Sequence, residues 1–365
     1  MIEYIEPGQP VPTEIAWRTM AVSGAAAVLG GLSLQAHVLS GNDLGGALGV
    51  SADDASWVIA AGVVAEGFAV LVASILVSAF GVRLVIFTGA VTTGLLAAAW
   101  LAAGPIGMAA RVPLRFAEGF ACGLLPVVMM VWSMRGFPPE RRVLPLVLFA
   151  FASSFPSAFA ASATGFATLH WGGCGIFVAD LFWPWPLALA AFWFCPREPM
   201  QFSRLRDADW VGYAILSTGV GLLLLFLNQG ERRFWLETAW MAPLVTAAIV
   251  LLALAVAYLL VAKKPLLDLS LLLRSTFAIA MVEALSLRFG LLMASFAVPQ
   301  ALARLAGFRL EQSGEAVLWL AVGQLVGFPL AWAWLTCHDS RWTLGAALGV
   351  FSGCRSEGGG NRLVA

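Results

Sequence analysis

Two opposite charges lie three residues apart in a stretch that is otherwise apolar. The segment "VPLRFAEGFACGLLPVV" starts at Val112 and contains Arg115 and Glu118. Residues at i and i+3 share one face of a helix, so these two side chains can partly neutralise each other. One interpretation is an ion pair that only fixes helix packing. The other, which we favour, is a charged site that lines a transport path, because ionisable groups at bilayer depth usually face a bundle interior or a wet cavity.

Glu66 is an isolated acid in the middle of another apolar run, "AAGVVAEGFAVLVAS". No basic residue lies in the same run. Burial makes the ionised form of a carboxyl group costly, whereas an arginine on a neighbouring helix would favour that form. A carboxyl group balanced in this way can take a proton from one side of a membrane and release it to the other. We therefore predict that Glu66 carries protons, with a protonated packing residue as the alternative.

Further polar residues in apolar runs are candidates for the wall of a cavity. Two of them, Glu283 and Arg288, are five residues apart, about 140° around a helix, so they should face different neighbours. Hydrogen bonding between helices is the other role open to the glutamines. The cavity candidates are Gln35, Asp180, Glu283, Arg288 and Gln324.

The composition is that of a membrane protein. The 365 residues are 60% hydrophobic and only 12% charged, with a mean hydropathy of +0.87, whereas soluble domains are about a quarter charged. The formal net charge is zero, so nothing favours a nucleic-acid partner. The sequence contains no GxxxxGK[ST], HExxH or GxSxG motif, and His37, His170 and His338 are far apart. These absences disfavour an ATP-driven pump and an enzyme, and no metal cluster or cofactor is expected.

The apolar runs are long enough for spanning helices, which need about 20 residues each. Lipid exposure requires helices or a closed barrel, and runs of this length without alternation indicate helices. We predict an all-α membrane protein with 10 or 11 spans; the start of an eleventh lies at Trp342. The ten predicted spans lie near residues 19–40, 55–79, 84–104, 109–134, 143–168, 172–195, 210–228, 239–262, 275–299 and 314–335.

Lysine and arginine predict the orientation. With a cytoplasmic N-terminus, twelve of them fall in inside segments and four, Arg232, Arg233, Arg304 and Arg309, in outside loops. Positively charged loops stay in the cytoplasm, so the N-terminus is expected there. The first seventeen residues are acidic and rich in proline, which is unlike a cleavable signal peptide.

Three stretches resemble one transporter family. They are "NDLGGALGVSADDASWVIAAGVVAEG" from Asn42, "RFAEGFACGLLP" from Arg115 and "DADWVG" from Asp207. Their order and spacing resemble those of the 14-span drug:proton antiporters of the major facilitator superfamily (EmrB/QacA type). The resemblance implies a major facilitator-type helical bundle, with Arg115 in the position of the family's fourth-helix arginine and Glu118 where glutamine is usual.

The sequence departs from that family at two places that matter for coupling. In "SILVSAFGVR", the cytoplasmic gate loop keeps Gly81 and Arg83 but has Ser78 where the family has aspartate. The family's gate on the cytoplasmic face should therefore be weaker. The first helix offers only Ser33 and Gln35 where an aspartate is usual, which increases the importance of Glu66.

The resemblance also implies a domain division. An N-terminal six-helix bundle is expected over 1–200, an inserted two-helix hairpin over 201–265 and an incomplete C-terminal bundle over 266–351. An aberrant polar tail, "SGCRSEGGGNRLVA", follows over 352–365. The run before this tail is too short to cross a bilayer. Either it lies at the membrane interface or the chain is a truncated or frame-shifted product, and we favour truncation.

The leading functional hypothesis is a secondary transporter that exports amphipathic or hydrophobic small molecules (multidrug efflux) in exchange for protons. Glu66 would carry the proton, Arg115 would tune it and Glu118 would orient Arg115. The expected partners are membrane lipids, a small hydrophobic or cationic substrate and a periplasmic adaptor protein, in a bacterial inner membrane. The alternative is a non-transporting membrane protein derived from a transporter that binds a partner or lipid.

Overall fold

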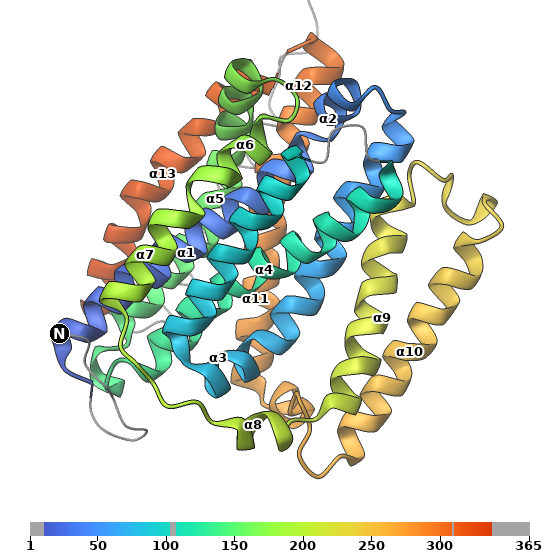
Figure 1. The fold of residues 1–365 in the computed structure, drawn as a ribbon. Helices are drawn as coiled ribbons and strands as arrows, with labels where there is room; N and C mark the ends of the chain where they lie inside the picture. The colour runs from blue at the N-terminus through green and yellow to red at the C-terminus, as the bar shows by residue number, and fades with distance from the viewer. Residues whose placement is uncertain (1–10, 103–106, 309, 338–365) are drawn as a thin grey trace, which may run out of the picture.

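A computed structural model describes residues 11–102, 107–308 and 310–337, without the side chains at positions 42, 108, 276, 283, 303, 304, 310, 311 and 337. The elements in this part of the chain are helices. The first seven α-helices form the central bundle in Figure 1. They are α1 (Thr13–Leu39), α2 (Gly41–Leu48), α3 (Ala52–Ala102), α4 (Met108–Arg135), α5 (Val143–Trp171), α6 (Gly175–Phe182) and α7 (Pro184–Phe194).

α3 is a helical hairpin and not one straight rod. Its 51 residues would extend for about 76 Å as a single helix, more than twice the thickness of a bilayer core. Gly81 interrupts it with φ 81° and ψ 160°, a backbone conformation that glycine adopts far more easily than other residues. The chain folds back at this point, as Figure 1 shows, so the two halves of α3 supply the second and third predicted spans.

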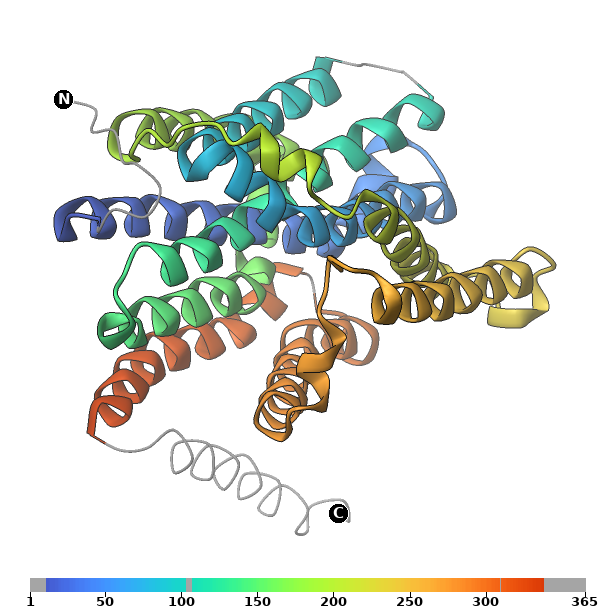
Figure 2. The same ribbon diagram turned by 90° about the horizontal axis from the view of Figure 1, so that it is seen from below.

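The helices after residue 200 lie around the bundle. A hairpin of α9 and α10 projects from one side of it, and α13 packs along α5 (Figures 1 and 2). Short turns of 3₁₀ helix lie at Pro139–Arg141, Trp235–Glu237 and Leu269–Leu273, and Met293–Ala297 forms a π-helical turn. The remaining elements are α8 (Phe202–Arg206), α9 (Trp210–Gln229), α10 (Met241–Val261), α11 (Ser275–Leu292), α12 (Val298–Ala306) and α13 (Leu310–Cys337).

The helix lengths confirm the predicted multi-pass membrane architecture. Within the described residues, nine helical segments are long and apolar enough to cross a membrane, and α3 counts as one of them. Because α3 folds back on itself, these segments account for all ten predicted spans. Helix α2 was not predicted. The apolar run at Trp342 lies outside the described residues, and the division into domains stays a prediction.

Small residues let the bundle helices approach closely. A Cβ atom added to Gly119 on α4 would lie 2.7 Å from the carbonyl oxygen of Gly62 on α3. Without a hydrophobic driving force between helices in lipid, such close packing is a main source of helix association. The contact between α3 and α4 is the most extensive in the described chain, and it positions the polar residues described next.

The bundle has two ends, named here after the short helices that they carry. The α8 end carries α8 and the start of α1, and the α2 end carries α2 and the connection between α9 and α10 (Figure 1). The bend at Gly81 lies at the α8 end, where Ala79 and Gly81 contact the linker between α7 and α8.

Candidate functional site

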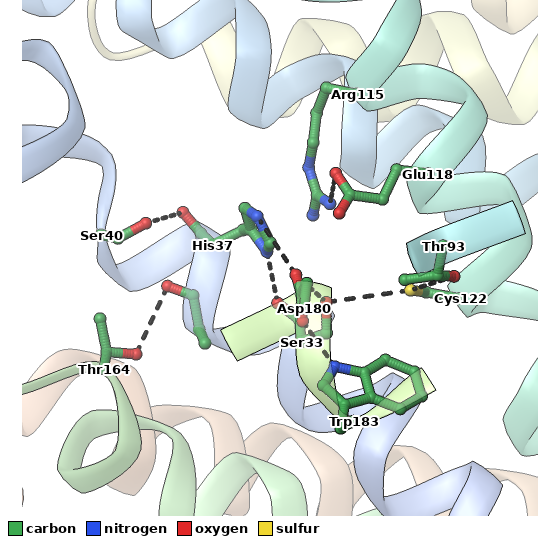
Figure 3. A network of polar contacts seen from close by, with 11 residues as sticks. Ser33, His37, Ser40, Thr93, Arg115, Glu118, Cys122, Thr164, Asp180 and Trp183 are labelled. Carbon is green, nitrogen blue, oxygen red and sulfur yellow. Dashed lines mark hydrogen bonds and ion pairs between the residues drawn. The ribbon is translucent and has the colours of Figure 1, made fainter. Parts of the chain in front are cut away.

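Helices α1, α4 and α6 bring one buried group of charged and polar side chains together (Figure 3). His37 comes from α1, Arg115 and Glu118 from α4, and Asp180 from α6; each is at most 2% exposed. The group lies toward the α2 end of the bundle, since His37 is near the end of α1 and Arg115 is near the start of α4. Four ionisable groups thus share one pocket of a bundle that is otherwise apolar.

The ion pair expected from the i, i+3 spacing is present within α4. Nη1 of Arg115 donates to Oε2 of Glu118 at 3.0 Å. The guanidinium lies against the backbone of α3, where a Cβ atom on Gly62 would be 2.7 Å from Nε of Arg115. Gly62 therefore makes room for Arg115, and any larger side chain there would displace it. Both charges are buried, so the pair depends on its mutual attraction and hydrogen bond to offset desolvation.

Asp180 and His37 face that pair from the other two helices. Oδ2 of Asp180 accepts a hydrogen bond from Oγ of Ser33 at 2.9 Å, and Oδ1 accepts one from Nε1 of Trp183 at 2.7 Å. Nε2 of His37 lies 3.6 Å from Oδ2 of Asp180. Asp180 was predicted as a cavity candidate, whereas His37 was missed. The only available sequence signal was that Ser33 and His37, at i and i+4, share one face of α1.

These three residues are also the ones that could surround a metal ion. Within the described residues, atoms of His37, Glu118 and Asp180 lie within 4.8 Å of one another. The spacing of the histidines in the sequence gave no hint of such a group, because its acids come from other helices. Imidazole and carboxylate are suitable donors for a transition metal, but the guanidinium of Arg115 on Glu118 repels a divalent cation.

Glu66 lies on the first half of α3 beside this cluster and is only half-buried. Gly123 of α4 is packed against it, with a Cβ position 3.0 Å from Cα of Glu66. Glu66 makes no hydrogen bond with another described residue. The two cations whose fields reach it are Arg115 from α4 and Arg288 from α11. The structure therefore brings the predicted proton carrier close to the predicted arginine and to a second one.

Arg288 connects the later helices to the bundle. Nη1 of Arg288 donates to the carbonyl oxygen of Ser153 on α5, and Nη2 donates to Oγ of the same serine, both at 2.8 Å. Arg288 was predicted as a cavity residue, but its side chain is exposed. It thus links α11 to α5, and its charge also acts on Glu66 of α3.

The remaining cavity candidates do not join this group. Gln35 is half-buried and takes part in no hydrogen bond with another described residue. Gln324 lines an apolar groove of about 370 Å³ on α13, together with Trp319 and Phe328. The side chain of Glu283 lies outside the described residues.

A larger cavity of about 830 Å³ opens near the α2 end, between α1, α3, α9 and α12. Its wall combines apolar side chains such as Ile59 and Phe296 with a polar set. A mixed wall of this kind suits an amphipathic ligand. The sequence did not predict this cavity, because its wall comes from segments more than 200 residues apart. The polar lining residues are Ser56, Asn228, Glu231, Arg232 and Gln300.

The predicted gate loop lies at the α8 end, at the bend of α3. Arg83 stacks its guanidinium over the ring of Phe192 on α7, 4.3 Å from the ring centre. Ser78 is half-buried and makes no hydrogen bond with a described residue. The backbone carbonyl of Ala79 accepts a hydrogen bond from the amide of Gln201 at 2.7 Å. The linker after α7 therefore holds the loop.

An acid that the sequence analysis missed lies against this bend. A Cβ atom on Gly81 would be 2.9 Å from Cβ of Glu198, and Glu198 pairs with Arg135 at 3.4 Å. Burial raises the pKa of the Glu198 carboxyl, and the attraction of Arg135 opposes that rise. Position 78 thus lacks the family's aspartate, but a glutamate from a different segment lies against the same bend.

The fold and these buried charges define a class: a multi-pass membrane protein with charged groups inside its helical bundle. Comparison with known proteins supports the same class. The chain is 25% identical over 278 residues to the fatty acid resistance protein FarB of Neisseria gonorrhoeae, covering 75% of this chain and 53% of FarB. It is 22% identical over 347 residues to the colistin resistance protein EmrB of Acinetobacter baumannii, covering 94% of this chain and 67% of that protein.

A third relative is the multidrug export protein EmrB of Haemophilus influenzae, 26% identical over 244 residues, which covers 65% of this chain and 46% of that protein. These matches confirm the resemblance to EmrB-type exporters. The chain spans about half the length of the curated relatives it matches. No family model matches the chain. The crystal structure of a D-xylose–proton symporter aligns with 89% of this chain and 91% of its own at 14% identity and a TM-score of 0.41.

Proposed function

We propose that this protein is a secondary transporter that exports amphipathic or hydrophobic small molecules in exchange for protons. The observation that carries the proposal is the position of Glu66, half-buried on α3 within the fields of Arg115 of the bundle and Arg288 of α11. An acid that interacts with two cations from different helices changes its attraction to both when it gains or loses a proton.

The printed names of the relatives support the choice of substrate. They refer to fatty acid resistance, colistin resistance and multidrug export. The cavity of about 830 Å³ with apolar and polar walls is large enough for a drug-sized molecule. We therefore assign amphipathic molecules as the substrate class and the cavity at the α2 end as a place on their route.

The proton acts in this mechanism through the position of α11. Ionised Glu66 attracts Arg288, which also donates to Ser153, so α11 is held against α3 and α5. Protonation removes that attraction and leaves the serine contacts alone. The proton thereby shifts the balance between two arrangements of α11, and a substrate that prefers one arrangement is linked to the proton gradient. The gradient supplies the energy, and no cofactor takes part.

The predicted orientation and partners complete the proposal. We place the protein in the bacterial inner membrane with a cytoplasmic N-terminus, so that the α8 end faces the cytoplasm. The bend at Gly81 and its neighbours Ser78, Arg83 and Glu198 then form the cytoplasmic gate. A periplasmic adaptor protein would contact the α2 end. The bundle over 1–200, the hairpin over 201–265 and the helices after 266 are treated as its working units.

The test is proton movement driven by a lipophilic dye cation in proteoliposomes that contain the full chain. Wild type should acidify or alkalinise the lumen when the dye gradient is imposed, and Glu66→Gln should abolish this response. Glu140→Gln, in an exposed turn between α4 and α5, is the matched control and should behave as wild type.

Two results would count against this proposal. Wild-type rates in Glu66→Gln would remove Glu66 as the proton carrier. A folded wild-type protein that moves neither dye nor protons would contradict transport itself.

A further inference from the structure

The cluster on α1, α4 and α6 contains two buried polar atoms that have no hydrogen-bond partner among the described residues. They are Nε2 of His37 and Oε1 of Glu118, on side chains that are 2% and 1% exposed. Figure 3 shows both side chains directed toward Asp180. Buried polar atoms are nearly always paired, so two unpaired ones in a single pocket require an explanation.

The hydrogen bond at Nδ1 of His37 identifies the ring nitrogen that can gain or lose a proton. Nδ1 lies 2.8 Å from the backbone carbonyl oxygen of Ser33. A carbonyl oxygen only accepts, so Nδ1 must carry a hydrogen atom and donate it. Nε2 is then the position that is either bare or protonated. When it is bare, its lone pair faces a carboxylate oxygen of Asp180 at 3.6 Å with no donor between them.

The carboxyl groups of Asp180 and Glu118 differ in how many of their oxygens accept a hydrogen bond. Both oxygens of Asp180 accept hydrogen bonds, from Ser33 and from Trp183, and two such donors stabilise the ionised form. Glu118 accepts from Arg115 through Oε2 alone, which leaves Oε1 open. The two sites at which an additional proton can reside are therefore the two unpaired atoms.

A charge count shows that one proton is needed. Arg115 contributes one positive charge, and ionised Glu118 and Asp180 contribute two negative charges, so the cluster with neutral His37 carries a net charge of −1. A net charge buried in an apolar bundle is costly. One proton, on Nε2 of His37 or on Oε1 of Glu118, makes the cluster neutral and gives the unpaired atom a hydrogen to donate.

We propose that His37, Asp180 and Glu118 form a buried site that binds one proton, in addition to Glu66. The groups that face it come from several helices, and α1 contributes His37 and Ser33. α4 contributes Arg115, Glu118 and the thiol of Cys122, which reaches Ser33 at 3.8 Å. α6 contributes Asp180. The hydroxyls of Thr164 on α5 and Thr93 on α3 lie nearby and are uncharged. The charged group of α3 beside the cluster is Glu66, on which the charge of Arg115 acts.

The same count argues against a divalent metal. A divalent cation would bring the cluster to a net charge of +1, with Arg115 already bound to Glu118. A proton brings it to zero. A proton also needs no cavity, and it can pass between atoms that lie within 4.8 Å of one another without movement of a helix.

Arg115 connects this site to Glu66. It is bonded to Glu118 and its field reaches Glu66. When the cluster loses its proton, the added negative charge draws Arg115 inward and weakens its attraction to Glu66. Proton release from one site therefore makes the other easier to protonate. This role in exchange rests on the proposed function, whereas binding of the proton does not.

The experiment measures proton occupancy and not flux. The full chain is labelled with ¹⁵N-histidine in lipid nanodiscs, and the His37 signal is assigned by its loss in His37→Gln. Infrared spectra of the same samples report protonated carboxyl groups, and Glu118→Gln identifies the contribution of Glu118. Both readouts are followed against pH in wild type, Asp180→Asn and the control Asp207→Asn, whose aspartate is exposed in the linker after α8.

In wild type we expect one proton, seen either on His37 or as a carboxyl band that Glu118→Gln removes. Asp180→Asn makes the cluster neutral without it and should reduce the affinity for this proton at least about tenfold, equal to about one pH unit. Asp207→Asn should match wild type. Failure of the dye assay with these results intact would refute transport and leave the proton site standing.

Three results would overturn the site. His37 could be neutral in wild type with no carboxyl band lost in Glu118→Gln. Asp180→Asn could leave both readouts unchanged. Addition of sodium or zinc ions could displace the proton from wild type, which would identify a cation site instead.

Discussion

The central bundle and the helices that surround it are held in different ways. In the most apolar stretches of α3 and α4, 44% and 56% of the residues are buried, against 17% in α10 and none in Phe277–Leu302. The bundle therefore depends on close contact between helices, whereas the outer helices have few buried side chains to contribute. Helix α13 still packs along α5 and α9 along α3, and polar contacts at the ends of the α9–α10 hairpin add to the attachment of these helices.

Glycines make the difference visible because the same residue type has opposite surroundings. Gly62 and Gly119 touch each other across α3 and α4, whereas Gly323 and Gly327 on α13 have nothing within 4 Å of an added Cβ atom. In the bundle, glycine sets the distance between helices and makes room for Arg115. At these two positions of α13, glycine sets no distance to another described helix, whereas Gly314 near the start of α13 lies against the backbone of Ser162 on α5.

Polar contacts attach the outer hairpin. Gln229 at the end of α9 is fully buried and exchanges hydrogen bonds with Oγ of Ser56 on α3, at 3.1 and 3.2 Å. Arg233 pairs with Asp53 at 2.8 Å, a partly exposed pair that contributes little by itself. At the other end of the hairpin, Asp209 caps α9. Polar contacts thus hold the hairpin to α3 at the α2 end, and at the other end Asp209 joins α9 to α10.

The largest expected effect is a loss of stability on overpacking the contact between α3 and α4 in the bundle. Gly119→Ala places a Cβ atom 2.7 Å from the carbonyl oxygen of Gly62, which forces α3 and α4 apart. Overpacking of this kind costs about 1–3 kcal/mol. The matched change on α13, Gly323→Ala, meets no atom and should leave stability unchanged or slightly higher, because alanine favours a helix over glycine. Thermal unfolding in detergent compares the two, and equal losses would refute the difference between the regions.

A smaller effect is expected within the hairpin, at the end where Asp209 joins α9 to α10. Asp209 accepts hydrogen bonds from the amide of Gly212 at 2.8 Å, from the hydroxyl of Tyr258 at 2.9 Å and from the amide of Leu266 at 3.3 Å. Asp209→Ala removes the cap, at a cost of about 1 kcal/mol, and frees α10 from α9. Hydrogen exchange should rise at the start of α9 and around Leu266, without change in α3 and α4.

Asp207→Ala is the control for that variant, because the Asp207 side chain is exposed and makes no hydrogen bond with a described residue. Exchange that rises equally in both variants, or that rises throughout the bundle in Asp209→Ala, would show that the hairpin is not held by this cap.

The spans were predictable from the sequence, whereas contacts between distant segments were not. Apolar run length located all ten described crossings, and the i, i+3 spacing anticipated the contact between Arg115 and Glu118. No local pattern could bring His37 to Asp180, because 143 residues separate them and each lies alone in its own run. The same limit applies to Arg288 and Glu66, whose proximity depends on how α11 packs against the bundle.

The gate loop illustrates this limit most clearly. A motif comparison at position 78 shows only that an aspartate is absent, since it reads one segment at a time. The acid that lies at the bend, Glu198, belongs to the linker after α7 and is brought there by tertiary packing. A sequence search restricted to the loop could not find it.

The smallest expected effect concerns Glu198 and its dependence on pH. Burial raises the pKa of this carboxyl above its ordinary value of 4.5, and Arg135 opposes the shift. The folded protein then favours the protonated form, so the contribution of Glu198 to stability is present below 4.5 and is lost as pH rises through the raised pKa. Glu198→Gln stays neutral at every pH and keeps the contact with Gly81. The unfolding temperature of Glu198→Gln should equal that of wild type in acid and exceed it at neutral pH.

The difference in unfolding temperature between Glu198→Gln and wild type at each pH isolates Glu198 from the other groups that titrate. The same pair of proteins in an Arg135→Gln background should show a larger difference, because the opposing attraction is gone. If the unfolding temperature of Glu198→Gln instead falls below that of wild type as pH rises, the ion pair with Arg135 outweighs the burial of Glu198 at the bend. In that case an attraction between charges, and not close packing, would hold the α8 end of the bundle. The α8 end would then resemble the outer hairpin more than the bundle interior.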